Sequence, residues 1–480
     1  MSHTSNLKTN PDACPLAKKC GGCQLQNMSY DRQLKWKQAR CEILLKKFGK
    51  VDKIIGMENP YHYRNKVQAA FGRTKSGKII SGVYQSGSHR IVMVDNCMTE
   101  DEIADKIIVD IRNMLPKFKI RTYDEDRGTG FLRHVLVKRG FSSGEVMVVI
   151  VGASGYFPMK KKFTAALLEM HPEITTVVLN INPKDTNLVL GDREEVLYGN
   201  GYIEDTLCGC VFRISPKSFY QINPVQTEKL YGKAMELAEL DGNTKVLDAY
   251  CGIGTIGLVA AKTAGSVIGV ELNPDAVKDA ISNAKRNDAK NARFYCADAG
   301  DFMQELAENG ERFDVIFMDP PRSGSSKKFI ESLAVAAPKR VVYISCNPET
   351  LARDLQLMTK KGYKVKKICP VDMFPHTNHI ETVVQLSQRK ADAYIDIDLD
   401  LDELDITAAE SKATYDEIKE YVFNKFGLKV STLNIAQIKA KHGIIERECY
   451  NKGKDGHCVP NCPKEKEDAI VDALRYFKMI

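Results

Sequence analysis

The sequence has no stretch that approaches the roughly 18 uninterrupted apolar residues of a membrane-spanning helix, which argues against a membrane protein. Its opening residues, MSHTSNLKTNPDAC, have no apolar core, so they predict no secretory signal. The chain contains no internal repeat, and its 14 cysteines lack regular spacing, which argues against a disulfide scaffold. These absences predict a cytoplasmic protein in which metal ligation or thiol chemistry uses several cysteines.

What the sequence does contain is ordinary for a globular protein: 480 residues, 43% hydrophobic and 27% charged. Its patterns predict a disordered lead (1–13), a mixed α/β central region (14–220), an alternating α/β domain (221–390), an acidic linker (391–411) and a small helical extension (412–480). From about residue 244 strands and helices alternate, and a short turn joins the last two strands. This alternation predicts a doubly wound, Rossmann-like sheet with an antiparallel last strand.

A basic segment lies near the start of the chain, whose net charge is +7. Residues 35–90 carry 13 Lys or Arg against three acids, with Tyr61, Tyr63, Phe71 and Tyr84 among them. Cations interleaved with aromatic rings suit phosphates and unstacked bases, so the segment predicts RNA binding. A solvated lysine-rich surface is the alternative interpretation.

Three cysteines open the central region with the spacing Cys14-x5-Cys20-x2-Cys23. Soft thiolates this close in sequence can face one metal centre, and they select zinc or an iron–sulfur cluster. A closed site requires a fourth ligand. Cys97, in a polar turn between a predicted strand and helix, and Cys41, on a predicted amphipathic helix, are the two candidates.

A glycine-rich turn, LDAYCGIGTIGL, lies at the end of the first strand of the alternating domain. Gly252 and Gly254 let the backbone approach a ligand, and the following helix adds favourable dipoles. Glu271 ends the next strand, 23 residues after Asp248, where an acid can accept hydrogen bonds from ribose hydroxyls. These features are shared by NAD dehydrogenases and S-adenosylmethionine methyltransferases, so they leave both open.

The segment FDVIFMDPPRSG favours the methyltransferase interpretation, because an Asp-Pro-Pro sequence begins at Asp319, at the end of the fourth strand. Enzymes that methylate exocyclic amines usually have an aromatic residue after the prolines. Arg322 stands there instead, which argues against an amino-group target. A simple strand-ending turn is the structural alternative.

Cys346 ends the fifth strand in VVYISCNPETLARDL, where ligands of open α/β sheets bind. An inert core thiol is the alternative, but the following helix is expected to lower the pKa of this thiol. A thiolate that adds to C6 of a pyrimidine makes C5 nucleophilic, and a base must then remove the C5 proton. Glu381, at the start of the antiparallel strand, suits that role; otherwise it is a solvated acid.

These motifs occur in order with FYQINPVQTEKLY, YISCNPETLARDL and HIETVVQL, and over residues 12–389 the chain resembles the RNA uracil-5-methyltransferase family. It is most similar to the bacterial 23S ribosomal RNA members. The resemblance implies methyl transfer from S-adenosylmethionine to C5 of a uridine, with Cys346 as nucleophile and Glu381 as proton acceptor. It also implies an iron–sulfur and RNA-binding role for the central region, with a 4Fe-4S cluster on Cys14, Cys20, Cys23 and Cys97.

The resemblance further implies which residues line the cofactor and base pocket. Cofactor-binding residues would be Gln221, Tyr250, Gly252, Gly254, Glu271, Asp298 and Asp319, with Asp301 as the alternative to Asp298. Phe219 and Gln221 would contact a flipped uracil. His376 and His379 lie beside Glu381 in sequence, where structural or RNA contacts are as well supported as catalysis.

The resemblance predicts 23S ribosomal RNA as substrate and 5-methyluridine as product. Since no protein partner can be inferred from the sequence, a monomer is expected. The alternatives are the same chemistry on tRNA, or a non-enzymatic iron–sulfur RNA-binding factor. Many ribosomal RNA members begin with a small β-barrel, whereas this sequence begins almost at the cysteines.

Residues 395–480 lie outside the family pattern, and a helix-turn-helix or simple helical appendage is expected there. A metal site is conceivable at Cys449, His457, Cys458 and Cys462.

Overall fold

The structure is a computed structural model that describes residues 13–184, 188–388, 415–442, 463–477 and 479. The chain divides into two compact units, Met1–Asp392 and Ala393–Ile480. None of the helices among the described residues is long and apolar enough to cross a membrane. The predicted acidic linker lies outside the described residues, and so does all of the predicted lead except Ala13.

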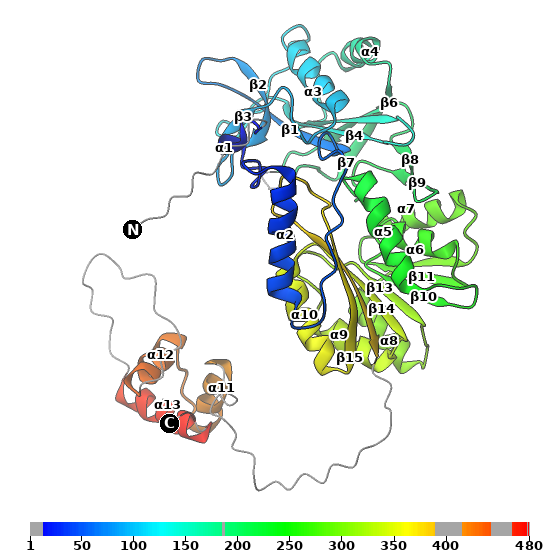
Figure 1. Cartoon of the computed structure of the whole chain (residues 1–480). Coiled ribbons are helices and arrows are strands. Elements are labelled where there is room, and N and C mark those ends of the chain that lie inside the picture. The colour runs from blue at the N-terminus through cyan, green and yellow to red at the C-terminus, as the bar shows by residue number, and fades with distance from the viewer. Residues whose placement is uncertain (1–12, 185–187, 389–414, 443–462, 478, 480) are drawn as a thin grey trace, which may run out of the picture. The chain divides into compact units, whose positions relative to one another are not determined.

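The first unit begins with a short helix, a long helix and a seven-stranded mixed sheet (Figure 1). The strand order is β3-β2-β1-β4-β5-β6-β7, with β5 and β6 parallel and the other neighbours antiparallel. The helices are α1 (Ala17–Cys20), α2 (Tyr30–Leu45), α3 (Glu102–Met114) and α4 (Lys160–Met170). The strands are β1 (Lys66–Arg73), β2 (Ile79–Tyr84), β3 (Ile91–Met93), β4 (Leu132–Arg139), β5 (Val146–Gly152), β6 (Ile174–Ile181) and β7 (Arg193–Tyr198).

The second sheet confirms the predicted doubly wound architecture, with strand order β12-β11-β10-β13-β14-β16-β15. Strands β10 to β14 are parallel, while β16 is antiparallel to both neighbours, as predicted. The strands are β10 (Lys245–Ala249), β11 (Ser266–Glu271), β12 (Ala292–Cys296), β13 (Val315–Met318), β14 (Arg340–Ser345), β15 (Tyr363–Val371) and β16 (Glu381–Gln388). The helices are α5 (Pro224–Ala238), α6 (Thr255–Ala261), α7 (Pro274–Arg286), α8 (Ala299–Glu308), α9 (Lys327–Ala336) and α10 (Pro348–Lys360).

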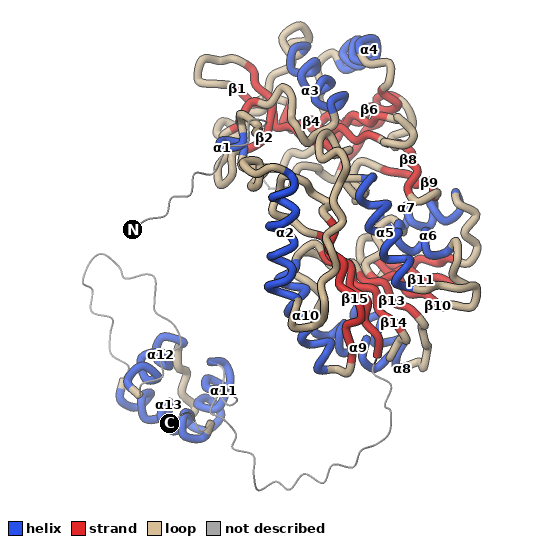
Figure 2. The backbone as a smooth tube through the Cα atoms, in the orientation of Figure 1, coloured by secondary structure: helices blue, strands red, loops and turns tan. Residues whose placement is uncertain are grey.

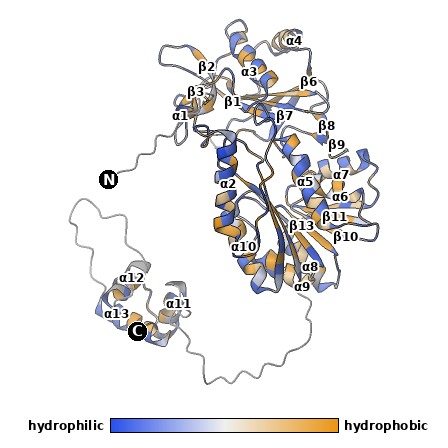
Figure 3. Cartoon of the chain, viewed as in Figure 1, coloured by the Kyte–Doolittle hydropathy of each residue, from blue (hydrophilic) through white to orange (hydrophobic). Residues whose placement is uncertain are grey.

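Helices cover both faces of this second sheet, so its central strands are buried and largely orange in Figure 3. A hairpin of β8 (Ile203–Leu207) and β9 (Cys210–Ile214) links the two sheets. Its buried residues share one apolar core with Leu136 of β4 and Val246 of β10. The two sheets therefore stabilise each other, and Figure 2 shows them in one unit.

Helix α2 comes early in the chain but packs against the second sheet. Cys41 and Leu45 on α2 are fully buried in the same apolar core as Leu247 and Val384. Two parallel bridges, Val51 with Ile368 and Ile55 with Val371, extend this contact. The residues between the cysteines and β1 thus complete the edge of the second sheet.

The second unit contains three helices, α11 (Tyr415–Phe426), α12 (Thr432–Lys441) and α13 (Lys464–Tyr476). The predicted helical extension therefore forms. Its core is small and self-contained, with Ile418, Val422, Ile435, Ile438 and Ile470 fully buried. Cys449, His457, Cys458 and Cys462 lie outside the described residues.

Candidate active site

The glycine-rich turn after β10 is shaped by close backbone approach and by positive φ angles. Tyr250, Gly252 and Gly254 have φ of 66°, 57° and 84°. The Gly257 amide donates to Asp248 Oδ2 at 2.7 Å, and a Cβ at Gly257 would lie 2.9 Å from that oxygen. Glycine is therefore required at this helix start. A Cβ added at Gly252 would meet no atom within 4 Å, so space for a ligand opens beside the turn.

Glu271 fastens this turn to the end of β11. Its Oε2 accepts the Gly252 amide at 3.1 Å and its Oε1 accepts the Asn273 amide at 2.8 Å. The carboxylate is thus fixed beside the open space, where an acid is expected to hold ribose hydroxyls. The turn and Glu271 fit the nucleoside of S-adenosylmethionine.

Tyr250 and Asp298 line a hollow of about 600 Å³ next to this turn. The Tyr250 hydroxyl lies 3.3 Å from Ser325 Oγ. Asp298 accepts the amides of Gly300 and Asp301 and so begins α8, while Asp301 pairs with Lys328 at the surface. Asp298 therefore lines the hollow, whereas Asp301 is engaged at the surface.

Asp319 ends β13 in surroundings that disfavour a charge. Burial raises the pKa of its carboxyl to about 7. Burial, followed by repulsion from Asp319 and Glu271, raises the pKa of Asp248 to about 8. Carboxyl groups thus lie together where β10, β11 and β13 end, and those of Asp248 and Asp319 are at least partly protonated near neutral pH.

Cys346 and Glu381 come together because β14 and β16 are antiparallel neighbours. The register pairs Ser345 with Thr382, which puts Cys346 and Glu381 at the same end of the pair. Glu381 is only 5% exposed, and burial followed by repulsion from Asp319 raises its pKa to about 8. Cys346 lines a hollow of about 210 Å³ with Arg40, Arg322 and others.

The Cys346 thiol has a pKa raised to about 11, first by burial and then by the carboxylates of Glu381 and Asp319. The pKa is therefore raised overall, and not lowered as the helix start led us to expect. Arg322 lowers it, but by less than the other effects raise it. Glu381, Asp319 and Arg322 all lie close enough to Cys346 to influence its charge.

The turn that carries Cys346 is held by its neighbours. Ser345 Oγ donates to the Asn347 carbonyl at 3.0 Å and accepts the Asn347 amide at 3.2 Å. Asn347 caps α10 by accepting the Glu349 amide, and Thr350 Oγ1 lies 3.3 Å from the Arg322 carbonyl. The turn is thereby tied to the loop after Asp319.

Phe219 and Gln221 approach the site from the segment between β9 and α5. Phe219 is 66% exposed, whereas Gln221 is buried. Gln221 hydrogen-bonds Tyr231, whose pKa is raised by burial and then by Asp319. Gln221 and Asp319 thus both lie close to Tyr231, and Phe219, two residues before Gln221 in sequence, is exposed.

The two histidines lie in different environments. His376 is buried, with its ring stacked on Tyr61 at 5.0 Å and hydrogen-bonded to Gln33 and the Pro60 carbonyl. His376 therefore helps to hold the loop between β15 and β16, in which it lies. His379 lines the hollow beside Cys346.

Sequence reasoning did not single out Arg40, which comes from α2 and lines the same hollow as Cys346. Its Nε donates to Glu349 at 3.1 Å, which ties α2 to the start of α10. The basic character of residues 35–90 was the available signal, but the packing of α2 on the second sheet was needed to find it.

The expected cluster cysteines are partly gathered. The pKa of Cys23 is raised by burial and by the nearby thiols of Cys20 and Cys14, and Arg64 opposes this. The Cys97 thiol lies 3.4 Å from Thr99 Oγ1. Among the described residues, no group of three or more His, Cys, Asp or Glu side chains is arranged to hold a metal. Cys41, the alternative ligand, is instead fully buried in the apolar core.

Comparison with known proteins gives consistent results. The profile of the tRNA (uracil-5-)-methyltransferase family matches residues 29–389. An uncharacterized RNA methyltransferase of Halalkalibacterium halodurans is 44% identical over 389 residues, which cover 79% of this chain and 85% of that protein. One of Oceanobacillus iheyensis is 45% identical over 393 residues, covering 81% and 85%.

A solved structure is also similar: the Pyrococcus abyssi tRNA (uracil-54, C5)-methyltransferase in complex with S-adenosyl-L-homocysteine. The TM-score is 0.64 at 29% identity, over 76% of this chain and 85% of that one. The family match over residues 29–389 includes the sheet edge at which Gly252, Glu271 and Cys346 lie.

Proposed function

Because the chain belongs to the tRNA (uracil-5-)-methyltransferase family, we propose that it methylates C5 of a uridine in RNA through a covalent adduct of Cys346. It is an S-adenosylmethionine-dependent RNA methyltransferase. The observation that best supports the covalent mechanism is the β14–β16 register, because it brings a thiol and a buried carboxyl to one sheet edge.

Cofactor binding is assigned to the residues around the glycine-rich turn. Glu271 and Asp298 are suited to hold the nucleoside, and Tyr250 and Gly252 border the adjoining space. Gly254 shapes the turn by its positive φ. When bound, S-adenosylmethionine supplies an electrophilic methyl group.

Cys346 acts first, when its thiolate forms a bond to C6 of the uracil and moves the C5–C6 electron pair toward the C4 carbonyl. C5 then carries electron density and takes the methyl group. The Glu381 carboxylate removes the C5 proton, the C5–C6 double bond re-forms, and the Cys346–C6 bond breaks to release the thiolate. Asp319 and Gln221 are suited to orient the base, and Phe219 to stack on it.

Two variants test this mechanism. The Cys346→Ala protein should fold normally, transfer no methyl group and form no adduct with 5-fluorouridine RNA. The Cys369→Ala protein removes a buried thiol of β15 and serves as the matched control. Methyl transfer by Cys346→Ala would contradict the assignment, whereas a wild type that binds RNA but transfers no methyl group would support an RNA-binding role without catalysis.

The RNA substrate is proposed to be 23S ribosomal RNA. The alternative is tRNA, which is supported by the named substrate of the similar Pyrococcus abyssi enzyme. Methyl transfer to isolated 23S and tRNA fractions, followed by mapping of 5-methyluridine, separates the two. Transfer to tRNA alone would contradict the ribosomal assignment without affecting the chemistry.

A 4Fe-4S cluster is proposed on Cys14, Cys20, Cys23 and Cys97. The first three thiols lie close to one another, which supports this proposal. Arg64 lies near Cys23 and also near Glu100, the hydrogen-bond partner of Cys97, so it links the two parts of the ligand set. Because the four thiols are not arranged to hold a metal in this structure, they must move closer together when the cluster binds. Anaerobically purified protein should contain about four iron and four sulfide per chain, and Cys97→Ser should lose them. Iron-free wild-type protein would contradict this.

A further inference from the structure

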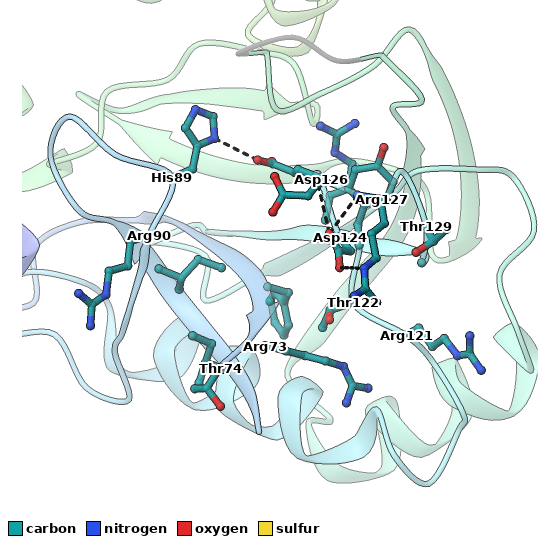
Figure 4. Close-up of a pocket in the computed structure, with 18 of the residues that line it drawn as sticks. Arg73, Thr74, His89, Arg90, Arg121, Thr122, Asp124, Asp126, Arg127 and Thr129 are labelled. Carbon is teal, nitrogen blue, oxygen red and sulfur yellow. Dashed lines mark hydrogen bonds and ion pairs between the residues drawn. The ribbon is translucent and has the colours of Figure 1, made fainter. Parts of the chain in front are cut away.

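A second large hollow lies on the central sheet and contains no residue of the methyltransferase domain. Its volume is about 1080 Å³, and its walls are β1, β2, the hairpin before β3 and the loop 121–130 (Figure 4). We call it the arginine groove, after Arg73, Arg90 and Arg121 in its lining. It is separate from the hollow that contains Cys346.

The groove is strongly basic. Six Lys or Arg line it, against three acids: Arg73, Lys75, Arg90, Arg121, Arg127 and Arg133, with Asp124, Glu125 and Asp126. Two of the acids are engaged, since Glu125 accepts from His89 and Tyr84 while Asp124 accepts the amides of Asp126 and Arg127. A net positive charge therefore remains to attract an anion.

The exposed arginines are available to a ligand. Within the described part of the chain, Arg73, Arg90 and Arg121 form no ion pair with a carboxylate, and Arg73 donates only to the Gly77 carbonyl. All three are exposed at the walls of the groove. Free guanidinium groups are the side chains best suited to bind phosphate.

The charge continues past the groove. A neighbouring hollow of about 920 Å³ shares Arg73 and Arg121 with it and adds Lys78 and Lys119. The two hollows together form an extended basic track with the Arg73–Arg121 pair in the middle. Such a track suits a polyanionic chain with successive phosphates better than a mononucleotide.

Aromatic rings line the same walls. Tyr84 is 37% exposed, and the Arg133 guanidinium lies 4.7 Å from the centre of the Tyr123 ring. Arg133 is itself buried and fixed by hydrogen bonds to the carbonyls of Asn182 and Lys184 at 3.1 and 2.7 Å. This fixed pair and Tyr84 offer surfaces on which an unstacked base can lie.

We propose that the arginine groove binds a single-stranded segment of the RNA substrate, away from the uridine that enters the active site. The proposal rests on the proposed RNA methyltransferase function and adds a substrate-binding site to it. Arg73 and Arg121 hold phosphates at the centre of the track, Arg90 holds a phosphate at one end, and Tyr84 contacts a base. The groove thereby selects RNA molecules that have a single-stranded segment next to the target uridine.

The test measures the affinity of Arg73→Ala/Arg121→Ala for a single-stranded RNA of about 20 nucleotides across a range of salt concentrations. Each lost phosphate contact lowers the salt slope of log K by about 0.7, so the double variant should lose about 1.4. Lys161→Ala/Lys162→Ala removes the same charge from exposed positions on α4 outside the groove and should keep the wild-type slope. Arg73→Lys/Arg121→Lys should also keep it.

Methyl transfer to the natural RNA separates this site from the active site. The Ala double variant should have a raised KM and an unchanged kcat, with thermal unfolding like that of the wild type. An unchanged slope, or an equal loss in the Lys161/Lys162 control, would overturn the proposal. Tighter binding of duplex RNA or an acidic peptide than of the single strand would also overturn it. A wild type that binds RNA through the groove but transfers no methyl group would refute only the proposed function.

Discussion

The pKa values of Cys346 and Glu381 both lie above neutrality, so at pH 7 most of both side chains are protonated. Arg322 lowers both, and its position after the two prolines brings it to the site. The carboxyl must ionise before it can accept the C5 proton, which makes proton removal sensitive to pH.

Because both the Cys346 thiol and the Glu381 carboxyl must lose a proton, the rate of methyl transfer should rise more steeply than tenfold per pH unit below the Glu381 pKa of about 8, and should keep rising above it toward the Cys346 pKa of about 11. Arg322→Met should shift this rise to higher pH because it removes the cation that stabilises the charged forms. The measurement is kcat against pH with saturating RNA. A profile that is flat between pH 6 and 9, or that Arg322→Met leaves in place, would contradict the assignment of the titrating group.

Replacement of the base should trap the reaction after methyl transfer. Glu381→Gln cannot take the C5 proton, so we expect kcat to fall by about 10² to 10⁴ while a methylated RNA–Cys346 adduct accumulates. Denaturing electrophoresis detects the adduct, and Cys346→Ala/Glu381→Gln should lack it. Full turnover by Glu381→Gln would show that another group removes the proton.

The Glu381 carboxyl also affects the stability of the folded chain, in a direction that depends on pH. Its pKa is raised in the folded chain, so folding favours the protonated form and the stability from Glu381 falls as pH rises from its unfolded pKa toward about 8. Glu381→Gln should consequently raise the melting temperature at pH 8.5 more than at pH 5. Equal shifts at both pH values would count against a buried, protonated Glu381.

At the scale of elements, helix α2 is joined to the methyltransferase sheet by a buried ion pair. Lys37 Nζ lies 2.5 Å from Asp372 Oδ1, both side chains are fully buried, and the Tyr30 hydroxyl donates to Asp372 Oδ2 at 2.9 Å. Burial lowers the pKa of Lys37, and Asp372 opposes that shift. The pair fixes the helix that carries Arg40 toward the active site.

Loss of one partner should leave a buried charge without compensation. We expect Lys37→Met to reduce the free energy of unfolding by about 3–5 kcal/mol, measured by urea denaturation. Lys37→Met/Asp372→Asn should recover part of this loss because the remaining charge is also removed. A single variant as stable as the wild type would contradict the importance of this contact.

Strand β4 supports the segment that presents Phe219. Lys138 Nζ donates to the carbonyls of Ser215 and Ser218 at 2.8 Å each, and Ser218 Oγ donates to Asp279 of α7 at 2.6 Å. The segment before Phe219 is therefore held by both sheets of the first unit. This contact explains how the central sheet can position the residue that we propose to stack on the base.

For the whole molecule, the division at Asp392 agrees with the end of the family match at residue 389. The second unit has its own core, and its role is not part of the methyl-transfer chemistry derived above. A chain that ends at Asp392 should therefore keep its thermal transition and its methyl transfer to within about twofold. Loss of folding on truncation would show that the first unit depends on residues 393–480.

Local sequence determined the strands, the glycine-rich turn and the candidate nucleophile. The alternation after residue 244 is a periodic signal, and the short distance between the last two strands allows only an antiparallel return. Gly252 and Gly254 could be anticipated from the turn pattern itself, and both have positive φ in the structure. The position of Cys346 and Glu381 at one edge followed from the same topology.

Only the tertiary structure decided the properties that depend on residues far apart in sequence. The raised pKa of Cys346 arises from burial and from Glu381 and Asp319, which come from other strands of the sheet. Arg40 reaches the site because α2 packs on a sheet formed some 200 residues later. The arginine groove likewise combines the basic segment with the loop 121–130. Charge, burial and cavity shape are sums over spatial neighbours, so the fold must form before they acquire a value.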